Sequence, residues 1–302
     1  MSTRRLALDV DVRPPFDGAA LLRWLGARAV PGVEEVTGIR YRRVLPLPSG
    51  PVVLEVDLGA DRAAAALIVP ADTASDGRGS GVGESEARAL VPAAVRALVD
   101  GDVDPSAVLA ALGGDPHLGP LVRARPGLRC PGTVDPAELA VRAVLGQQVS
   151  VAAARTVAGR LAADLGLPLA APSGTLRWAF PTPQALATLA PDSLPMPRSR
   201  TRALLGLAAA LADDTLELSP ATDPGAAREA LLSIPGIGPW TADYVAMRAL
   251  ADRDAFPAGD LVLRRAARDL GLPHDEPGLR RHARAWRPWR AYAAHHLWAG
   301  RG

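Results

Sequence analysis

Residues 231–242 read LLSIPGIGPWTA and carry the strongest structural signal in the chain. An apolar helix end runs into a Pro-Gly-Ile-Gly turn, and a second helix starts at once with Pro239 in its first turn. Gly236 and Gly238 let the backbone turn tightly and approach another molecule closely. The pattern predicts two helices joined by a hairpin whose unpaired N–H groups point outward and suit a phosphate oxygen. A plain corner between two helices would also explain a Gly-x-Gly turn.

Further along the chain, residues 256–265 read FPAGDLVLRR. Asp260 stands directly before an apolar-periodic helix that we expect to end before Gly271. An ordinary N-cap is the simplest use of an aspartate at such a place. The same helix start would keep the carboxylate ionised, because its N–H groups and dipole stabilise negative charge. Asp260 is therefore both a predicted cap and a candidate catalytic residue.

Four more side chains are candidates for contact with a base. Trp240 and Tyr244 lie four residues apart and so share one face of the second helix. They would form either part of the core or a wall on which a flat, cationic base stacks. Gln147 and Gln148 lie in a turn between two predicted helices. They would either complete a polar turn or enter the space of a displaced base.

The C-terminal segment combines arginine with tryptophan. In residues 280–298, several arginines interleave with Trp286, Trp289 and Trp298. The segment predicts either a basic strip that faces DNA or arginine–tryptophan packing on a solvated helix. The pair His295-His296 has no metal-ligand spacing with another histidine, so we interpret it as structural.

Composition excludes several classes of function. The 302 residues carry a formal net charge of +2 and contain one cysteine, Cys130, and no lysine. Lysine Schiff-base chemistry is therefore excluded, as are internal disulfides and clusters held by several cysteines. The N-terminus has no apolar run typical of a signal peptide, and no stretch approaches the ~18 apolar residues of a membrane span. We expect a cytoplasmic protein with no cofactor and no metal bound by side chains.

The pattern of apolar residues predicts an α+β fold in two parts. Residues 1–85 predict an N-terminal antiparallel α/β domain, because short alternating strands and turns surround one helix. The expected strands are 6–12, 33–44, 52–58 and 64–69, and the expected helix runs from Asp17 to about Val30. We expect this domain to support the rest of the chain, because no motif in it carries chemistry.

Residues 86–302 predict an all-α region. Helix starts are marked by Asp135, Ser150, Thr182 and Asp223, most of them followed by proline. Interior helices are expected over about 117–222, and the hairpin and catalytic helices over about 223–302. We expect a surface connection at the glycine-rich residues 70–83 and no strand beyond it.

These motifs together resemble a known family. LLSIPGIGPWTADYVAMRAL followed by FPAGDLVLRRAARDLG is similar to the helix-hairpin-helix, Gly/Pro-rich loop and Asp signature of the base-excision DNA glycosylases, and in particular to the bacterial 3-methyladenine DNA glycosylase II family. The similarity extends to residues 14–36, 123–156 and 280–298. It covers nearly the whole chain apart from the glycine-rich connection.

The resemblance implies an enzyme that flips alkylated purines, of the 3-methyladenine and 7-methylguanine type, out of duplex DNA and hydrolyses their N-glycosidic bond. It makes Asp260 the essential aspartate and places Trp240 and Tyr244 at the base pocket. It places Gln148, beside Gln147, where a wedge fills the gap left by the flipped nucleotide. The phosphate-gripping hairpin, whose backbone carbonyls in relatives can also hold a monovalent cation, corresponds to Pro235, Gly236, Ile237, Gly238 and Pro239.

Two positions depart from the family pattern, and a third position indicates that the enzyme lacks strand-cleaving activity. Gln148 stands where an apolar wedge can occur, and Gly259 stands where a second aspartate can precede Asp260. Trp240 occupies the place at which strand-cleaving relatives carry a lysine. We therefore expect a monofunctional enzyme without lyase activity, acting as a monomer on nucleoid DNA.

Two alternatives stay open. One is a monofunctional glycosylase of the same fold for deaminated or mismatched bases, a choice that depends on pocket shape. The other is a non-catalytic DNA-binding protein that uses the hairpin only to hold phosphates. Asp260 separates this last alternative from the first two, because a protein that only binds DNA has no need of the carboxylate.

Overall fold

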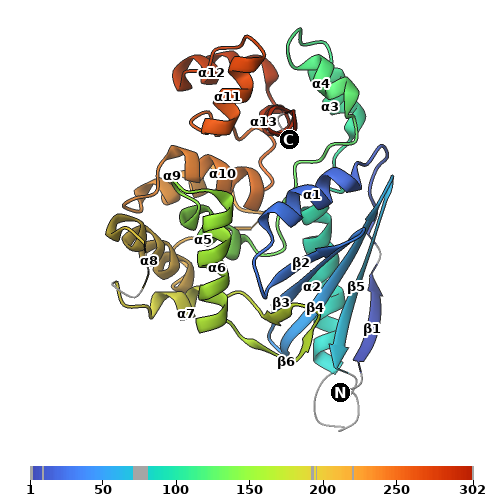
Figure 1. Ribbon diagram of the computed structural model, residues 1–302, viewed down its shortest axis with the longest axis vertical. Coiled ribbons are helices and arrows are strands. Elements are labelled where there is room, and N and C mark those ends of the chain that lie inside the picture. Colours follow the sequence, from blue (N-terminus) through green and yellow to red (C-terminus); the bar gives the residue numbers. More distant parts are fainter. Residues whose placement is uncertain are drawn as a thin grey trace.

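The computed structural model describes residues 3–8, 10–70, 81–191, 194, 196–219 and 221–300. Figure 1 shows a twisted sheet with helices packed on it, continued by a helical region that makes up the rest of the molecule. The predicted α+β class, a sheet domain followed by a helical domain, is confirmed. In the part of the chain that is described, no helix is both long and apolar enough to cross a bilayer.

The N-terminal sheet is antiparallel and has five strands in the order β1-β5-β4-β3-β2, in which β2 to β5 form a meander and β1 pairs with β5 at the edge. The strands expected at 52–58 and 64–69 are found, and the run at 33–44 divides at a turn where Gly38 has a φ of +59°. The expected strand at 6–12 is wrong in its bounds: the strand covers Thr3–Leu8, because its pairing with β5 ends at Leu8. The strands are β1 (Thr3–Leu8), β2 (Glu34–Thr37), β3 (Arg40–Leu47), β4 (Gly50–Gly59) and β5 (Arg62–Pro70).

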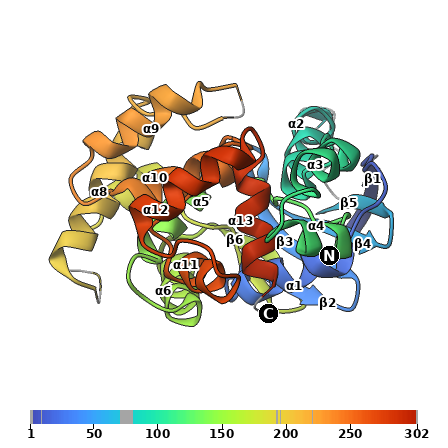
Figure 2. The same cartoon turned by 90° about the horizontal axis from the view of Figure 1, so that it is seen from above.

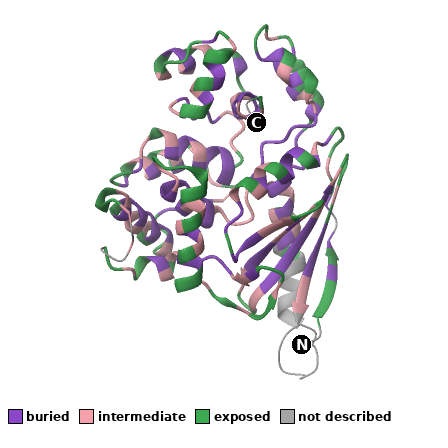
Figure 3. Cartoon of the chain, in the orientation of Figure 1, coloured by how far each residue is buried: buried purple, intermediate pink, exposed green. Residues whose placement is uncertain are grey.

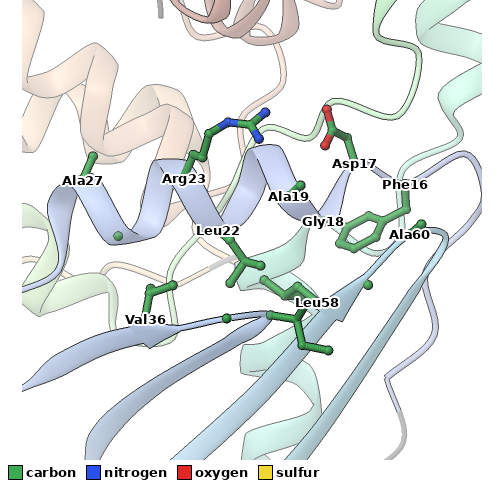
Figure 4. Close-up of a pocket in the computed structure, with 14 residues that line it drawn as sticks. Phe16, Asp17, Gly18, Ala19, Leu22, Arg23, Ala27, Val36, Leu58 and Ala60 are labelled. Atoms are coloured by element: carbon green, nitrogen blue, oxygen red, sulfur yellow. The ribbon is translucent and has the colours of Figure 1, made fainter.

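The two faces of the sheet are covered differently. Alternate residues of β4, among them Leu54 and Leu58, enter one core with α1 (Gly18–Arg28) and α2 (Gly81–Val99). Asp17 caps α1 as predicted, its side chain accepting from the N–H of Ala20. A groove of about 640 Å³ stays open between α1 and the edge of the sheet (Figure 4).

The opposite face of the sheet carries a hairpin that we did not expect. Strands β6 (Pro168–Ser173) and β7 (Leu176–Trp178) pair and pack Leu176 against Val44 and Val53. The expectation of no strand beyond residue 83 is therefore wrong. The segment has no alternating apolar run, and it becomes extended because the sheet covers it and the Gly32 carbonyl accepts two of its N–H groups.

The connection between the two parts of the chain is only partly described. Most of the expected glycine-rich connection at 70–83 lies outside the described residues, and α2 begins at its last positions. Val91, Val95 and Leu98 of this helix are buried in the core of the sheet. The division at residue 85 stays a prediction.

Buried residues of the helical region belong to one hydrophobic core, and Figure 3 marks in purple where buried residues lie along the helices. The predicted caps Asp135, Ser150, Thr182 and Asp223 all accept a hydrogen bond from the first turn of their helices. The helices are α3 (Pro105–Leu112), α4 (Gly119–Ala124), α5 (Pro136–Leu145), α6 (Val151–Leu165), α7 (Pro183–Ala187), α8 (Arg198–Ala212), α9 (Pro224–Ser233), α10 (Pro239–Ala249), α11 (Leu261–Asp269), α12 (Glu276–His282), the 3₁₀ turn η2 (Ala283–Trp286) and α13 (Arg290–Ala299).

A buried group of charges joins the sheet to the helical region. Arg43 of β3 pairs with Glu138 of α5 at 2.5 Å, and Arg142 of α5 reaches Glu34 of β2 at 2.9 Å. The Tyr41 hydroxyl donates to Glu34 as well. Ion pairs that are this deeply buried fix geometry, because removal of one partner leaves an unpaired charge in the interior. Arg142 also donates to the carbonyl of Arg28 at the end of α1, so this group of charges holds β2, β3 and α1 in place beside α5.

Candidate active site

The hairpin between α9 and α10 has the tight geometry that its glycines predict. Gly236 has a φ of +93°, and a Cβ at this position would lie 2.9 Å from the Cβ of Ala203 on α8. Ile237 is buried between the two helices and anchors the turn to the core. Ile237 thus fixes the turn to the core, and Pro235 and Gly236 stay exposed to solvent.

The hairpin presents several backbone N–H groups without an acceptor. Among the described residues, no hydrogen bond is made by the N–H groups of Gly236, Gly238, Trp240 and Thr241. The last two belong to the first turn of α10, where such groups are always left unpaired by the helix itself. Together they form a local concentration of donors at a positive helix end, which suits an anionic oxygen.

The two glutamines of the α5–α6 turn have different environments. Gln147 donates from Nε2 to the Gly236 carbonyl at 3.1 Å and to the Thr241 hydroxyl at 3.0 Å. It therefore ties the turn to the hairpin. Gln148 is exposed and has a φ of +56°, a left-handed conformation that non-glycine residues rarely adopt. Gln148 is therefore exposed and directly follows the residue that contacts the hairpin.

Asp260 is the N-cap of α11 and carries three donors on one carboxylate. Its Oδ1 accepts from the N–H of Leu263 at 2.8 Å and from Nε1 of Trp298 at 3.1 Å. Its Oδ2 accepts from Nε1 of Trp240 at 3.0 Å. The helix-capping bond and the two indole donors thus hold both carboxylate oxygens in a fixed orientation.

The predicted aromatic pair lies next to this carboxylate. The rings of Trp240 and Tyr244 stack with centroids 5.4 Å apart and planes 12° from parallel. The Tyr244 hydroxyl accepts a hydrogen bond from Arg248 at 2.8 Å. Both rings are half-buried rather than enclosed in the core. The spacing of four residues therefore brings the two rings together beside Asp260, as the helix pattern predicts.

Two further tryptophans belong to this site and were not predicted for it. Trp298 of α13 bonds Asp260 directly, and Trp24 of α1 packs against Trp298 with centroids 5.6 Å apart. Trp298 was visible in the sequence only as one of three tryptophans among arginines. Trp24 comes from the N-terminal domain, which carries no motif, so no local signal marks it. We call Asp260, Trp240, Tyr244, Trp298 and Trp24 the Asp260 cluster.

Three of the five C-terminal arginines make ion pairs with acidic residues of the protein. Arg287 and Arg290 both bond Asp254, and Arg280 lies 3.1 Å from Glu276. These three arginines therefore pair with acidic side chains on a partly exposed surface. His295 is buried among Trp24 and Trp298, in agreement with a structural role for this residue.

Charges near the cluster shift two pKa values. Burial raises the pKa of Tyr244, but the charges of Arg248, Arg28 and Arg142 outweigh it and leave the pKa below its usual 10. Burial, helped by Arg248 and Arg28, lowers the pKa of His295 well below 6.5, so this imidazole is neutral at pH 7. Positive charge is thus concentrated on the side of the cluster where the Tyr244 hydroxyl lies.

Within the described ranges, no three His, Cys, Asp or Glu side chains gather as they would around a metal ion. The Gly236 carbonyl of the hairpin accepts from Gln147 and keeps a second lone pair. A backbone cation site at the hairpin stays a prediction.

Fold and site together define a helix-hairpin-helix protein in which an aspartate caps the helix that follows the hairpin pair. The chain belongs to the HhH-GPD superfamily of base excision DNA repair proteins, whose model matches residues 141–291. Residues 7–135 match the AlkA N-terminal domain. The family resemblance seen in the sequence and the predicted α+β fold class are therefore both confirmed.

Several known proteins that are similar to this chain support its membership of this superfamily. The chain is 44% identical over 299 residues to the Mycobacterium tuberculosis "Probable bifunctional transcriptional activator/DNA repair enzyme AlkA", and spans 57% of the length of that protein. It is 36% identical to Escherichia coli "DNA-3-methyladenine glycosylase 2", with 96% of each chain covered. The 3-methyladenine DNA-glycosylase structure from Archaeoglobus fulgidus shares the fold, with a TM-score of 0.76, 20% identity and coverage of 98% and 97%.

Proposed function

We propose that this protein hydrolyses the N-glycosidic bond of alkylated purines in duplex DNA and leaves an abasic site. The observation that carries the proposal is the carboxylate of Asp260, held by one backbone and two indole N–H groups beside a stacked aromatic pair. Family membership and the name of the Escherichia coli relative support the choice of reaction.

The chemistry needs little acid catalysis. Alkylation at a ring nitrogen makes the purine cationic and so already a good leaving group. As the C1′–N bond breaks, the electron pair leaves with the base and positive charge develops on the sugar. An ionised Asp260 stabilises this charge and orients or deprotonates the water that adds to C1′. The stacked rings of Trp240 and Tyr244 favour a cationic base by cation–π attraction.

Access to the base requires that it leave the duplex. Extrusion costs a few kcal/mol and costs least for a damaged or poorly stacked base. In our proposal the free N–H groups at Gly236 and Gly238 hold a phosphate, which positions the strand without reading its sequence. Gln148, exposed on the neighbouring turn, fills the gap in the duplex. Gln147 keeps that turn at a fixed distance from the hairpin.

The proposed enzyme is monofunctional. Strand cleavage by the lysine route requires a side-chain amine, and these 302 residues include no lysine. Trp240, at the position where lyases carry that lysine, is instead used as a hydrogen-bond donor to Asp260. The proposed substrate of the enzyme is double-stranded DNA with alkylated bases, which would place the enzyme at the nucleoid in the cytoplasm. We propose that the enzyme acts as a monomer.

The test compares the wild type with Asp260→Asn on methylated duplex DNA, with strand breaks scored before and after alkali. We expect released alkylpurines and breaks only after alkali for the wild type. The variant should lose at least ~10²–10³-fold in base release, the usual scale for a lost electrostatic stabiliser, with DNA affinity unchanged within a few-fold. Equal release by both proteins would contradict the mechanism.

Failure of the wild type to release methylated bases has a separate meaning. Release of deaminated or mismatched bases instead would favour the alternative of a same-fold glycosylase that acts on those bases. Intact binding to abasic DNA with no base release on any of these substrates would favour a DNA-binding protein.

A further inference from the structure

The first two turns of helix α8 lie directly against the hairpin. The Cβ that Gly236 lacks would lie 3.2 Å from the carbonyl oxygen of Ser199, as well as touching Ala203 one turn later. Further along the helix, a Cβ at Gly206 would lie 3.1 Å from a methyl carbon of Ile234. Helix α8 therefore runs beside the hairpin, and its N-terminal turns are next to Gly236, whose N–H group makes no hydrogen bond within the described ranges.

Two arginines of α8 flank this contact. Ser199 and Ala203 are four residues apart, so they share the face of α8 that meets the hairpin. Arg200 comes one position after Ser199, and Arg202 comes one position before Ala203. Since each residue of a helix turns by about 100°, the two arginines project on opposite sides of that face. Arg202 is exposed and Arg200 is half-buried.

These two guanidiniums are unpaired, unlike several of the C-terminal arginines. In the part of the chain that the structure describes, neither Arg200 nor Arg202 makes a side-chain hydrogen bond or an ion pair. Arg287 and Arg290, by contrast, both bond the carboxylate of Asp254. All the N–H donors of Arg200 and Arg202 are therefore available to an anion outside the protein.

The segments that meet at the hairpin contain no acidic residue. The α5–α6 turn reaches the hairpin through Gln147, and α8 packs against it at Gly236. Residues 146–163, 196–212 and 230–242 together contain five arginines and no Asp or Glu, although the whole chain has 34 arginines and 32 acidic residues. A surface with charge of one sign attracts a polyanion such as nucleic acid. The positive charge of this nearly neutral chain is thus unbalanced around the hairpin.

The arginines do not stabilise the helix that carries them. The first turn of α8 has no acidic residue, and no side chain caps it. Cations near a helix N-terminus are opposed by the helix dipole, and Arg198 and Arg202 are like charges four residues apart, which repel each other. Stability alone would favour acidic residues at these positions. The arginines are therefore explained better by an anionic partner than by the packing of α8.

We propose that Arg200 and Arg202 bind phosphates of the DNA that neighbour the phosphate held by the hairpin, so that α8 extends the DNA interface. The inference deepens the proposed function and rests on its assignment of a phosphate to the hairpin. A guanidinium matches a phosphate with two parallel N–H···O bonds. Such contacts position the strand and read no sequence. The hairpin thus binds DNA with backbone donors, and α8 binds it with side-chain charge.

The experiment measures the affinity of the whole chain for undamaged duplex DNA at several salt concentrations. Each phosphate contact that is lost lowers the slope of log affinity against log salt by about 0.9. We expect Arg202→Gln and Arg200→Gln each to show this change, with affinity lowered about fivefold to tenfold near 0.1 M salt. A duplex of different sequence should give the same changes. Arg202→Lys keeps the charge and should keep most of the slope.

Arg62→Gln is the matched control. Arg62 is exposed and begins β5, which Figures 1 and 2 place across the molecule from α8. Its loss removes the same charge and should leave affinity and slope unchanged. Thermal unfolding of each variant adds a second measurement. Because substitution of Arg202 removes repulsion within α8, the Arg202→Gln variant should unfold at the same or a higher temperature than the wild type while it binds DNA more weakly.

The outcomes distinguish the inference from the function on which it rests. A wild type that binds DNA but releases no base overturns the proposed function, and the slopes of the variants still decide the inference. A wild type that releases alkylpurines, with affinity and slope unchanged in Arg200→Gln and Arg202→Gln, overturns the inference and leaves the function standing. Weaker binding that is equal in Arg62→Gln, or that comes with a lower unfolding temperature, assigns the effect to general charge or to folding and also overturns the inference.

Discussion

The hairpin and the Asp260 cluster are neighbours, because α10 starts at the one and carries a wall of the other, but they depend on different parts of the chain. The hairpin is built within residues 234–241, and its N–H groups are free because of backbone geometry. The cluster needs α1, α10, α11 and α13 together. Figure 2 shows these elements converging from both parts of the molecule.

This comparison separates binding from catalysis and specificity. A phosphate can be held by a short loop, since backbone donors need only the right dihedral angles. A carboxylate with fixed donors and aromatic walls needs side chains that project from several elements, each held in place by its own packing. Changes in the docking of the two domains should therefore affect the cluster more than the hairpin.

The largest effect is expected at the buried charges that dock the sheet on α5. Arg43→Met leaves Glu138, 3% exposed, without its closest cation and should lower the free energy of unfolding by about 3–5 kcal/mol. Denaturant unfolding measures this loss. Arg40→Met in the same strand is the control, because its pair with Asp57 is partly exposed and should contribute less than about 1 kcal/mol. Equal losses in the two variants would argue against docking by this cluster.

The next effect concerns the donors to Asp260. Trp298→Phe keeps an aromatic ring and removes one indole N–H, and we expect base release to fall about tenfold to a hundredfold, as for a hydrogen bond of ~1.5–3 kcal/mol to a charged group. Trp240→Phe should behave alike. DNA affinity, which depends on the hairpin, should stay the same in both. Single-turnover rates of base release and DNA affinities, measured for the same variants, check this prediction. A variant that loses DNA affinity as well as base release would contradict it.

A glycine pair tests the hairpin itself. Gly236→Ala forces a side chain into a φ of +93° and against Ala203, and should cost about 1–3 kcal/mol with weaker binding to any DNA sequence. Gly238→Ala is the control, because its Cβ would meet no atom within 4 Å and its φ is −101°. Similar binding by the two variants would show that the strained turn is not what presents the N–H groups.

The effect that is smallest near neutral pH, and grows only on acidification, is a pH dependence of stability. Burial, with Arg125, lowers the pKa of His296 from 6.5 to about 4, so below pH 6.5 the unfolded chain binds a proton that the folded chain does not. Stability should therefore be complete above pH 6.5 and fall toward pH 4, by up to about 1.4 kcal/mol per pH unit for this histidine. His295, whose pKa is also lowered by burial, acts in the same direction. His296→Asn should flatten the slope measured by urea unfolding at several pH values, and an unchanged slope would assign it to other groups.

The elements with local signals were predictable. Alternating residues mark the sheet, and Asp135, Ser150, Asp223 and Asp260 mark helix starts, because a cap is a bond between a side chain and an amide two or three residues away. The β6–β7 hairpin was not predictable. It is extended because a sheet built by residues far away in the chain covers it, and its own sequence has no alternation.

The hairpin, the capping aspartate and the aromatic pair could be found from local sequence alone, since each depends on spacings of a few residues that a helix or turn converts directly into geometry. The tertiary structure alone decided that Trp298 and Trp24 join Asp260, and that Arg28 faces Tyr244 from the other domain. Contacts between distant segments are set by the packing of whole elements, and no local pattern records which side chains meet there.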